Sequence, residues 1–164
     1  MPRVSGWFVV NVADVRATKH GHGATRIGFE DRDNPFPELG VNIRVVEPGQ
    51  PTGLYHSETV QEDFLVLSGE CLAIIDGEER PLRAWDFVHC PAGTNHVFVG
   101  AGDGPSAILM VGARGKDRRV HYPVEESAAR FGASVDAETS DPREAYASWE
   151  PKFAPVEIDW PPSA

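Results

Sequence analysis

The stretch FLVLSGECLAIIDGEERPLR, residues 64–83, decides the fold class of this chain. Short apolar runs alternate in it with turn residues, and the pair Asp76-Gly77 separates CLAII from EERPLR. This pair is a strong hairpin signal, because a type I′ turn needs a positive φ at both of its central residues. Gly69 marks a further corner. The stretch therefore predicts antiparallel strands that are joined by tight turns.

The same pattern continues on both sides of this stretch, from Gly40 to Gly112. Runs of strand length recur about every ten residues, and no helical period lies between them. This spacing is typical of an all-β sandwich or barrel and argues against βαβ units. The other predicted strands are GVNIRVVE (40–47), LYHSE (54–58), DFVHC (86–90), HVFVG (96–100) and AILMVG (107–112).

The flanks of this pattern differ from its middle. We expect an N-terminal extension at residues 1–39, a barrel at 40–113 and a C-terminal tail at 114–164. The extension contains one convincing strand, Trp7–Val12, and then a loop-like stretch that is rich in glycine and charged residues. We interpret the chain as one barrel, with both flanks packed on it or on a second subunit.

Two short helices are predicted in the C-terminal tail. Residues 123–131 begin with a proline, carry acids in the first turn and are followed by Gly132, which are start and stop signals of a helix. Residues 141–149 repeat this scheme, with Asp141 as the candidate N-cap and a proline after it. From Pro151 onward the frequent prolines predict an extended chain.

Charge and composition limit the partners of the protein. Its 164 residues include 25 acidic and 15 basic side chains, which gives a formal net charge of −10. A net-negative chain without a basic block is a poor ligand for nucleic acid or anionic lipid. The short basic run at residues 114–119 is expected in an exposed loop. A DNA-binding regulator is disfavoured as well, because no helix-turn-helix segment precedes the barrel.

The sequence also predicts a cellular location. No apolar run approaches the roughly eighteen residues that a transmembrane helix needs. The run Trp7–Val10 is too short for the core of a signal peptide, and no cleavage site of small residues follows it. We therefore expect a cytoplasmic protein with no membrane partner. In that compartment Cys71 and Cys90 are expected to be thiols, and Cys90 to be a core residue.

Chemistry-bearing residues gather in GQPTGLYHSETVQEDFLVLSG, residues 49–69. In a strand, side chains two positions apart share a face, so His56 and Glu58 point the same way. Glu62 joins them if the strand continues without a bulge. Later in the chain, a turn in CPAGTNHVFVG (90–100) leads into a strand that begins with His96. Imidazole and carboxylate are ligands that suit divalent iron, manganese, cobalt, nickel or zinc.

These residues resemble the two sequence motifs of the cupin superfamily, whose members are small double-stranded β-helix barrels of the jelly-roll type. The first motif, G-x5-H-x-H-x3-4-E-x6-G, is similar to the run from His56 to Gly69, with its opening glycine displaced by one position. The second, G-x5-P-x-G-x2-H-x3-N, is similar to the segment around His96, although Trp85 stands at its first glycine and Gly100 at its asparagine.

The resemblance implies a divalent metal ion inside the barrel, such as iron, manganese, nickel or zinc. Its ligands would be His56, Glu58, Glu62 and His96. Glu58 stands where the family usually has a second histidine, so it is either a fourth ligand or a base or hydrogen-bond acceptor just outside the ligand set. Two alternatives remain at this point: an exposed acidic strand face, and a barrel that has lost its metal.

Other residues have simpler interpretations. Phe64 and Phe98 share the faces of Glu62 and His96, so they either line a ligand pocket or fill the barrel core. His20 and His22 form an H-G-H sequence that we expect in a solvated loop. The aromatic residues of the tail cover the mouth of the barrel or pack on its outside, and the sequence leaves both options open. They are Trp149, Phe153 and Trp160.

The sequence favours a metal-binding single-domain cupin that acts on a small organic molecule, and dioxygenase, isomerase and decarboxylase chemistry all remain open. The alternative is a non-catalytic cupin that binds a small ligand, with a structural metal or none. We also expect a homodimer, because an N-terminal strand can add to the sheet edge of a neighbouring subunit and protect it.

Overall fold

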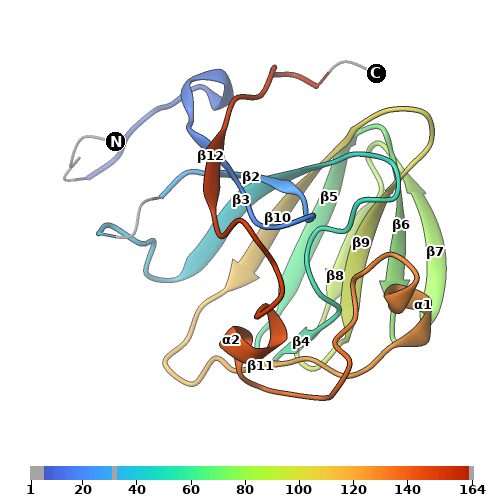
Figure 1. The fold of residues 1–164 in the computed structure, drawn as a ribbon. Helices are drawn as coiled ribbons and strands as arrows, with labels where there is room; N and C mark the ends of the chain where they lie inside the picture. Colours follow the sequence, from blue (N-terminus) through green and yellow to red (C-terminus); the bar gives the residue numbers. More distant parts are fainter. Residues whose placement is uncertain (1–5, 31–32, 163–164) are drawn as a thin grey trace.

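The largest part of the fold is an antiparallel sheet with the strand order β12-β1-β2-β3-β10-β5-β8 (Figure 1). The computed structural model describes residues 6–30 and 33–162. Every strand pair in this sheet is antiparallel. Its strands are β1 (Ala17–Lys19), β2 (Thr25–Gly28), β3 (Leu39–Val46), β5 (Glu62–Ser68), β8 (Phe87–Cys90), β10 (Ser106–Ala113) and β12 (Ala154–Val156).

Two smaller sheets complete the barrel. One has the order β7-β6-β9, and the other pairs β11 with β4. Their strands are β4 (Ser57–Glu58), β6 (Glu70–Ile75), β7 (Glu78–Arg83), β9 (His96–Ala101) and β11 (Val120–His121). The predicted all-β barrel is confirmed. The hairpin between β6 and β7 turns at Asp76 and Gly77, whose φ angles of 46° and 79° are those that the sequence predicts for a type I′ turn.

The interior of the barrel is an apolar core, to which the seven-stranded and the three-stranded sheets both contribute side chains. Phe64 and Val66 of β5 lie in it beside Phe98 of β9, and Cys71 and Cys90 are buried there as free thiols, as predicted. Burial raises the pKa of each thiol to about 12, so neither is ionised at neutral pH. At one end of the barrel this core gives way to charged and polar side chains, which form the candidate site described below.

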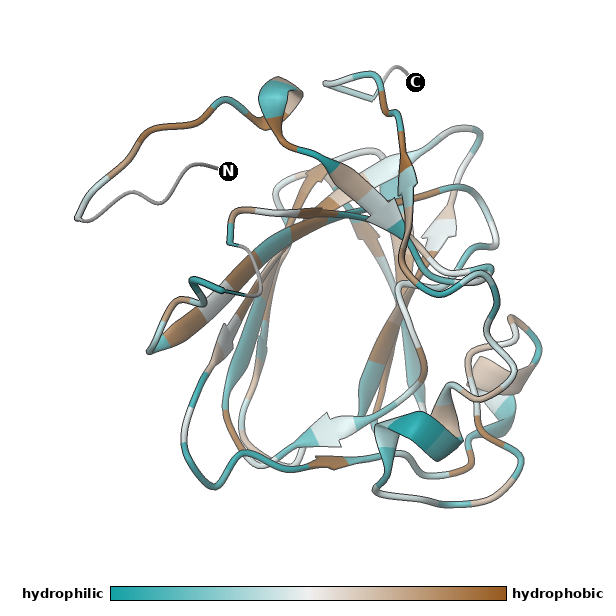
Figure 2. Cartoon of the chain, turned by 60° about the vertical axis from the view of Figure 1, so that its left-hand side comes forward, coloured by the Kyte–Doolittle hydropathy of each residue, from teal (hydrophilic) through white to brown (hydrophobic). Residues whose placement is uncertain are grey.

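The N-terminal extension is organised differently from the prediction. Trp7–Val12 is not a strand: the residues from Trp7 to Asn11 pair with none of the described strands, and Val12–Asp14 forms the 3-10 turn η1. The side chains of Trp7 and Val9 are 87% and 89% exposed. An apolar run forms a strand only where a neighbouring backbone pairs with it, and none does here. Figure 2 shows this hydrophobic segment projecting from the barrel.

The strands of the extension come later, in the stretch that was expected to be a loop. β1 and β2 pair with each other, and β2 continues the sheet to β3. β12, from the extended C-terminal tail, pairs with β1 on the other side. The N-terminal extension and the C-terminal tail therefore meet in one sheet. Apolar side chains from both cover the outer face of this sheet. These include Val15, Ile27, Val156 and Trp160.

The two predicted helices exist but are short. α1 is Glu126–Ala129, so the helix begins three residues after the proline that was predicted to start it. Its N-cap is Glu125, whose carboxylate accepts a hydrogen bond from the Ser127 amide. α2 is Pro142–Ala145, with Asp141 as its N-cap, as predicted. In the described residues, 6–30 and 33–162, no helix is long and apolar enough to cross a membrane.

Candidate metal centre

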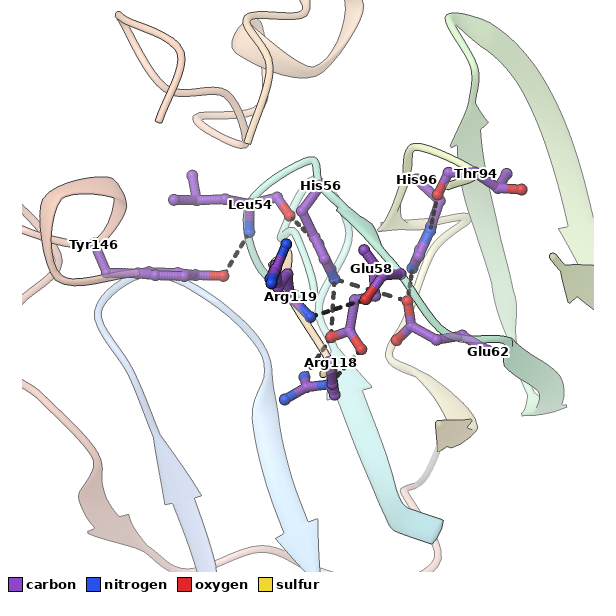
Figure 3. A network of polar contacts seen from close by, with 10 residues as sticks. Leu54, His56, Glu58, Glu62, Thr94, His96, Arg118, Arg119 and Tyr146 are labelled. Carbon is purple, nitrogen blue, oxygen red and sulfur yellow. Dashed lines mark hydrogen bonds and ion pairs between the residues drawn. The ribbon is translucent and has the colours of Figure 1, made fainter. Parts of the chain in front are cut away.

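Three side chains converge at the end of the barrel interior. His56 precedes β4, Glu62 begins β5 and His96 begins β9, and a backbone bridge pairs His56 with His96 across the gap between two sheets. One ligand atom from each residue lies within 4.8 Å of those from the other two. Figure 3 shows the three side chains turned toward one another. His56 and Glu62 come from the segment 49–69, and His96 comes from the segment 90–100, as the sequence predicts.

Backbone carbonyls fix the protonation of both imidazoles. His56 Nδ1 lies 2.7 Å from Leu54 O, and His96 Nδ1 lies 3.0 Å from Thr94 O. A carbonyl oxygen only accepts, so each Nδ1 must carry the donated hydrogen. Burial lowers the pKa of His56 and, together with the His56 charge, lowers that of His96 to about 3. Both rings are therefore neutral at pH 7 and present an Nε2 lone pair to the centre.

Glu62 completes the group with a carboxyl that retains its proton. Burial and the neighbouring Glu58 carboxylate raise the pKa of Glu62 to about 8. Its Oε2 lies 3.2 Å from His96 Nε2 and 4.0 Å from His56 Nε2. Two acceptor atoms at such distances repel unless a proton or a cation lies between them. At neutral pH the Glu62 proton relieves this repulsion in the metal-free protein.

Glu58 lies next to these residues but is bound to another group. Its Oε1 is 3.9 Å from His56 Nε2, and its side chain is only 7% exposed. Both of its oxygens accept hydrogen bonds from Arg118, one of them from Nε at 2.6 Å and the other from Nη2. Figure 3 shows the guanidinium on the side of Glu58 that faces away from His96. The structure thus brings all four predicted residues together and gives Glu58 a partner of its own.

The three converging residues fit a divalent transition metal. Two neutral imidazole nitrogens and one carboxylate are a donor set of the two-histidine, one-carboxylate kind. Both imidazoles have the backbone hydrogen bond on the opposite nitrogen that orients metal-bound histidines in proteins. A divalent cation would also replace the Glu62 proton between the facing acceptors. The arrangement is thus suited to such an ion in donor type, protonation and charge.

Comparison with known proteins identifies the barrel. A family model described as "Cupin domain" matches residues 42–112, which include His56, Glu58, Glu62 and His96. This chain contains a cupin domain. The match agrees with the resemblance that the two motifs imply, and it runs from within β3 to the last but one residue of β10. No curated protein matches the chain.

Solved structures with the same cupin fold have low sequence identity to this chain. A sugar phosphate isomerase from Silicibacter pomeroyi superimposes with a TM-score of 0.62 and 24% identity, over 73% of this chain and 88% of that one. A candidate sugar phosphate isomerase from Acidithiobacillus ferrooxidans gives 0.53 and 26%, over 60% of this chain and 65%, less than two thirds, of that one. The polyketide cyclase RemF from Streptomyces resistomycificus gives 0.57 and 20%, over 66% and 80%.

The structure explains one departure from the second cupin motif and shows the cost of another. A Cβ atom on Gly100 would lie 2.1 Å from Glu47 O, so the asparagine of the motif does not fit at this position. Trp85, at the first glycine of the motif, has a φ of 76° and is 73% exposed. The backbone there keeps the left-handed conformation that suits glycine, although this sequence places a bulky residue in it.

A cavity of about 650 Å³ extends from the three converging residues to rings of the C-terminal tail. Trp149 and Phe153 line it, whereas Trp160 packs with the apolar cluster on the outer face of the large sheet. Both options that the sequence left open are therefore realised, by different residues. Phe64 and Phe98 likewise line the cavity and also belong to the barrel core.

Several residues of the cavity were not identified from the sequence. His20 is not in a solvated loop: its ring lies 5.1 Å from that of Tyr146 and 4.4 Å from that of Phe153. The sequence predicts Arg118 in an exposed loop, whereas its side chain binds Glu58, sixty positions earlier in the chain. The strand pattern of the sequence gives no signal for a partner at this separation. The aromatic residues of the tail are a usable signal in the sequence, whereas nothing in the sequence singles out Arg44.

Proposed function

We propose that this chain is a metal-dependent cupin enzyme that acts on a small organic molecule, with a divalent transition metal held by His56, Glu62 and His96. The observation that carries the proposal is the convergence of two Nε2 lone pairs on one buried carboxyl. The carbonyls of Leu54 and Thr94 fix the hydrogens of both rings on the opposite nitrogens. Filling the core alone does not require two imidazole lone pairs to face one carboxyl.

The residues around this centre have separable roles in the proposal. When bound, the ion would polarise a substrate oxygen as a Lewis acid, or activate O2 if it is iron. Glu62 gives up its proton when it becomes a ligand. Glu58, held by Arg118, keeps acceptor oxygens beside the centre, where they can bind a substrate hydroxyl or take its proton. The adjoining cavity has the size of a pocket for a small organic ligand.

The names of structural neighbours do not select the reaction. The neighbours include proteins named as isomerase, cyclase and decarboxylase. One fold that carries several chemistries cannot by itself identify a substrate. A candidate sugar phosphate isomerase at 26% identity supports including isomerisation of a phosphorylated compound among the reactions to test.

Metal content is the direct test of this proposal. We expect about one iron, manganese, nickel or zinc per chain, measured by mass spectrometry on untagged protein that is purified without chelators. His56→Ala and His96→Ala should each lose the ion. His89→Ala is the matched control, because His89 pairs with Asp63 on the protein surface and lies outside the cavity.

Two outcomes would contradict the proposal. A parent protein that lacks metal, and whose thermal stability does not change when ions are added, would favour the alternative of a non-catalytic ligand-binding barrel. Metal that is retained equally in His96→Ala and in the parent would place the ion elsewhere. A cytoplasmic location is part of the proposal, and fractionation of the source cells tests it.

We further infer that the chain forms a homodimer through its N-terminal segment. Trp7 and Val9 are strongly exposed, and the backbone of residues 7–11 pairs with no strand in the described part of the chain. A second copy that adds this segment to a sheet edge would bury these side chains. Light scattering at micromolar concentration should give the mass of a dimer, and Val9→Ser should shift it toward the monomer. A monomeric parent would contradict this inference.

A further inference from the structure

The cavity has a charge opposite to that of the protein. The chain has a net charge of −10, yet the cavity is lined by five arginine or lysine side chains and two glutamates. Cationic walls in a site of low dielectric attract anions and raise their local concentration. The two glutamates are Glu58 and Glu62. The basic side chains of the lining therefore outnumber its acidic ones.

Three of these five cations form ion pairs with acidic side chains of the protein. Arg118 binds Glu58, and Arg114 binds Glu30 through both of its terminal nitrogens. Lys152 lies 3.9 Å from Glu150. Arg44 differs from them, because no acid among the described residues forms an ion pair with it.

Arg44 is a partly buried cation without an acidic partner among the described residues. Its Nε is buried and has no hydrogen-bond acceptor among the described residues. The residue directly opposite on β2 is another cation, Arg26. Burial and the charge of Arg26 lower the pKa of Arg44 to about 10, which still leaves it charged at neutral pH. A guanidinium with a buried Nε, a like charge opposite and no acidic partner is unfavourable for the fold, and a bound anion would compensate this charge.

Arg44 lines the same cavity as the three converging residues and the rings of His20 and Tyr146. The rings of His20 and Tyr146 lie 5.1 Å apart. An anion bound to Arg44 is therefore placed so that the rest of the same small molecule can reach the metal centre.

Two further polar atoms without partners lie in the same cavity. They are Asn42 Oδ1, two residues before Arg44 and on the same face of β3, and His20 Nε2. Both atoms are buried and form no hydrogen bond to the described residues. Three unpartnered polar groups that line one cavity indicate a ligand that satisfies them together.

We propose that Arg44 is the centre of a subsite for an anionic oxygen group, a carboxylate or a phosphate monoester, of the small-molecule substrate, and that Asn42 Oδ1 accepts a hydrogen bond from a donor group of the same molecule. The Arg44 guanidinium binds the anion through charge-assisted hydrogen bonds. Asn42 and His20 bind polar groups beside it, and the aromatic rings of the tail contact the organic part. Only the orientation of the other end toward His56, Glu62 and His96 rests on the function proposed above. Anion binding itself needs no metal.

The test follows the Arg44 Nε–H signal by nitrogen-15 NMR in metal-free protein at pH 7. Inorganic phosphate and acetate are titrated separately, and each should give a saturable shift. The Arg44→Met variant should bind the tighter anion about ten- to a hundredfold more weakly, as measured by calorimetry. Arg80→Gln is the matched control, because Arg80 pairs with Glu78 on the protein surface and lies outside the cavity, and its binding should equal that of the parent.

A second readout separates binding from a structural role. Arg44→Met removes an uncompensated charge and keeps the length of the side chain, so its metal-free form should unfold at the same temperature as the parent or higher. A lower melting temperature together with unchanged anion affinity would overturn the proposal, and so would the absence of saturable binding of both anions to the parent. Tighter binding of phosphate than of acetate would assign a phosphate monoester, and the reverse a carboxylate.

The same proteins distinguish failure of the subsite from failure of the metal centre. Each is tested for one bound divalent ion before the anion titration. Anion binding through Arg44 in a protein that takes up no metal would preserve the subsite and reject the metal-dependent function. Metal binding by His56, Glu62 and His96 without anion binding at Arg44 would do the opposite.

Discussion

Tyr146 and His56 are joined through a single residue, Leu54. The Leu54 amide donates a hydrogen bond to the Tyr146 hydroxyl at 2.9 Å, and the Leu54 carbonyl accepts one from His56 Nδ1 at 2.7 Å. Figure 3 shows Leu54 between the tyrosine and the imidazole. A residue that follows the helix α2 of the C-terminal tail thus holds the backbone that orients a candidate metal ligand. Tyr146 therefore contributes to the orientation of His56 through the backbone of Leu54.

Tyr146→Phe should weaken both stability and metal binding. Leu54 is 2% exposed, so its amide would lose its acceptor in a buried position, which costs about 1–3 kcal/mol. Metal affinity should fall with it, because the Leu54 carbonyl would no longer be fixed against His56. Urea denaturation and metal titration measure the two effects. Tyr122→Phe is the control, since the Tyr122 hydroxyl forms no hydrogen bond to the described residues. Equal behaviour of the two variants would contradict the link through Leu54.

The raised pKa of Glu62 predicts how stability of the metal-free protein depends on pH. The folded-state pKa is about 8 against an ordinary 4.5, so the folded state keeps a proton that the unfolded state has lost. This contribution is complete below pH 4.5, decreases as the pH rises toward 8 and is lost above it. The free energy of unfolding should therefore decrease over this range more steeply in the parent than in Glu62→Gln. Parallel curves for the two proteins would contradict the assignment.

The same proton should be released when metal binds. A carboxylate ligand must be deprotonated, so binding at pH 7 should release close to one proton per ion and should weaken as the pH decreases below 8. Calorimetry in two buffers with different ionisation enthalpies measures the number of protons. Binding without proton release would show that Glu62 is not a ligand.

Glu58 and Glu62 should respond differently to loss of charge. Glu62→Gln should reduce metal affinity by a hundredfold or more, on the order of the effect of losing a ligand or its closest support. Glu58→Gln should retain the ion, because Arg118 already binds both oxygens of Glu58. Turnover of any substrate that is found should decrease in Glu58→Gln if its carboxylate accepts a substrate proton. Loss of metal in Glu58→Gln would make Glu58 the fourth ligand.

The sequence was a good guide wherever local rules decide the structure. Runs of strand length that are separated by turn signals predict the strands of the barrel. The turn at Asp76-Gly77 follows from backbone sterics alone. The positions of His56, Glu62 and His96 follow from motif spacing within strands that pair in a single register.

The features that were missed depend on contacts between distant parts of the chain. Arg118 and Glu58 are sixty residues apart, and Tyr146 and Leu54 are ninety-two residues apart. No periodicity specifies such pairs, since they form only after the tail packs on the barrel. The predicted strand Trp7–Val12 failed for the converse reason: its composition favours a strand, but no described segment pairs with it. Arg44 gave no signal because its significance is the absence of a partner.

Trp85→Gly should stabilise the protein even though it removes a large apolar side chain. The φ of Trp85 is 76°, a conformation that costs a residue with a Cβ roughly 1–2 kcal/mol and costs glycine little. The ring is 73% exposed, so little packing is lost. Glycine also increases the conformational freedom of the unfolded chain, which reduces this stabilisation by about 0.5–1 kcal/mol. The free energy of unfolding should therefore increase by up to about 1 kcal/mol, which urea denaturation measures.

Phe87→Gly is the matched control for this prediction, because Phe87 is similarly exposed, at 64%, but lies in the strand β8. Glycine in a strand interior weakens the strand, so this variant should be less stable than the parent. If both variants lose stability, the Trp85 ring contributes more by packing than its backbone costs. If only Phe87→Gly does so, the family glycine at position 85 is a requirement of backbone conformation, which this sequence meets at a measurable loss of stability.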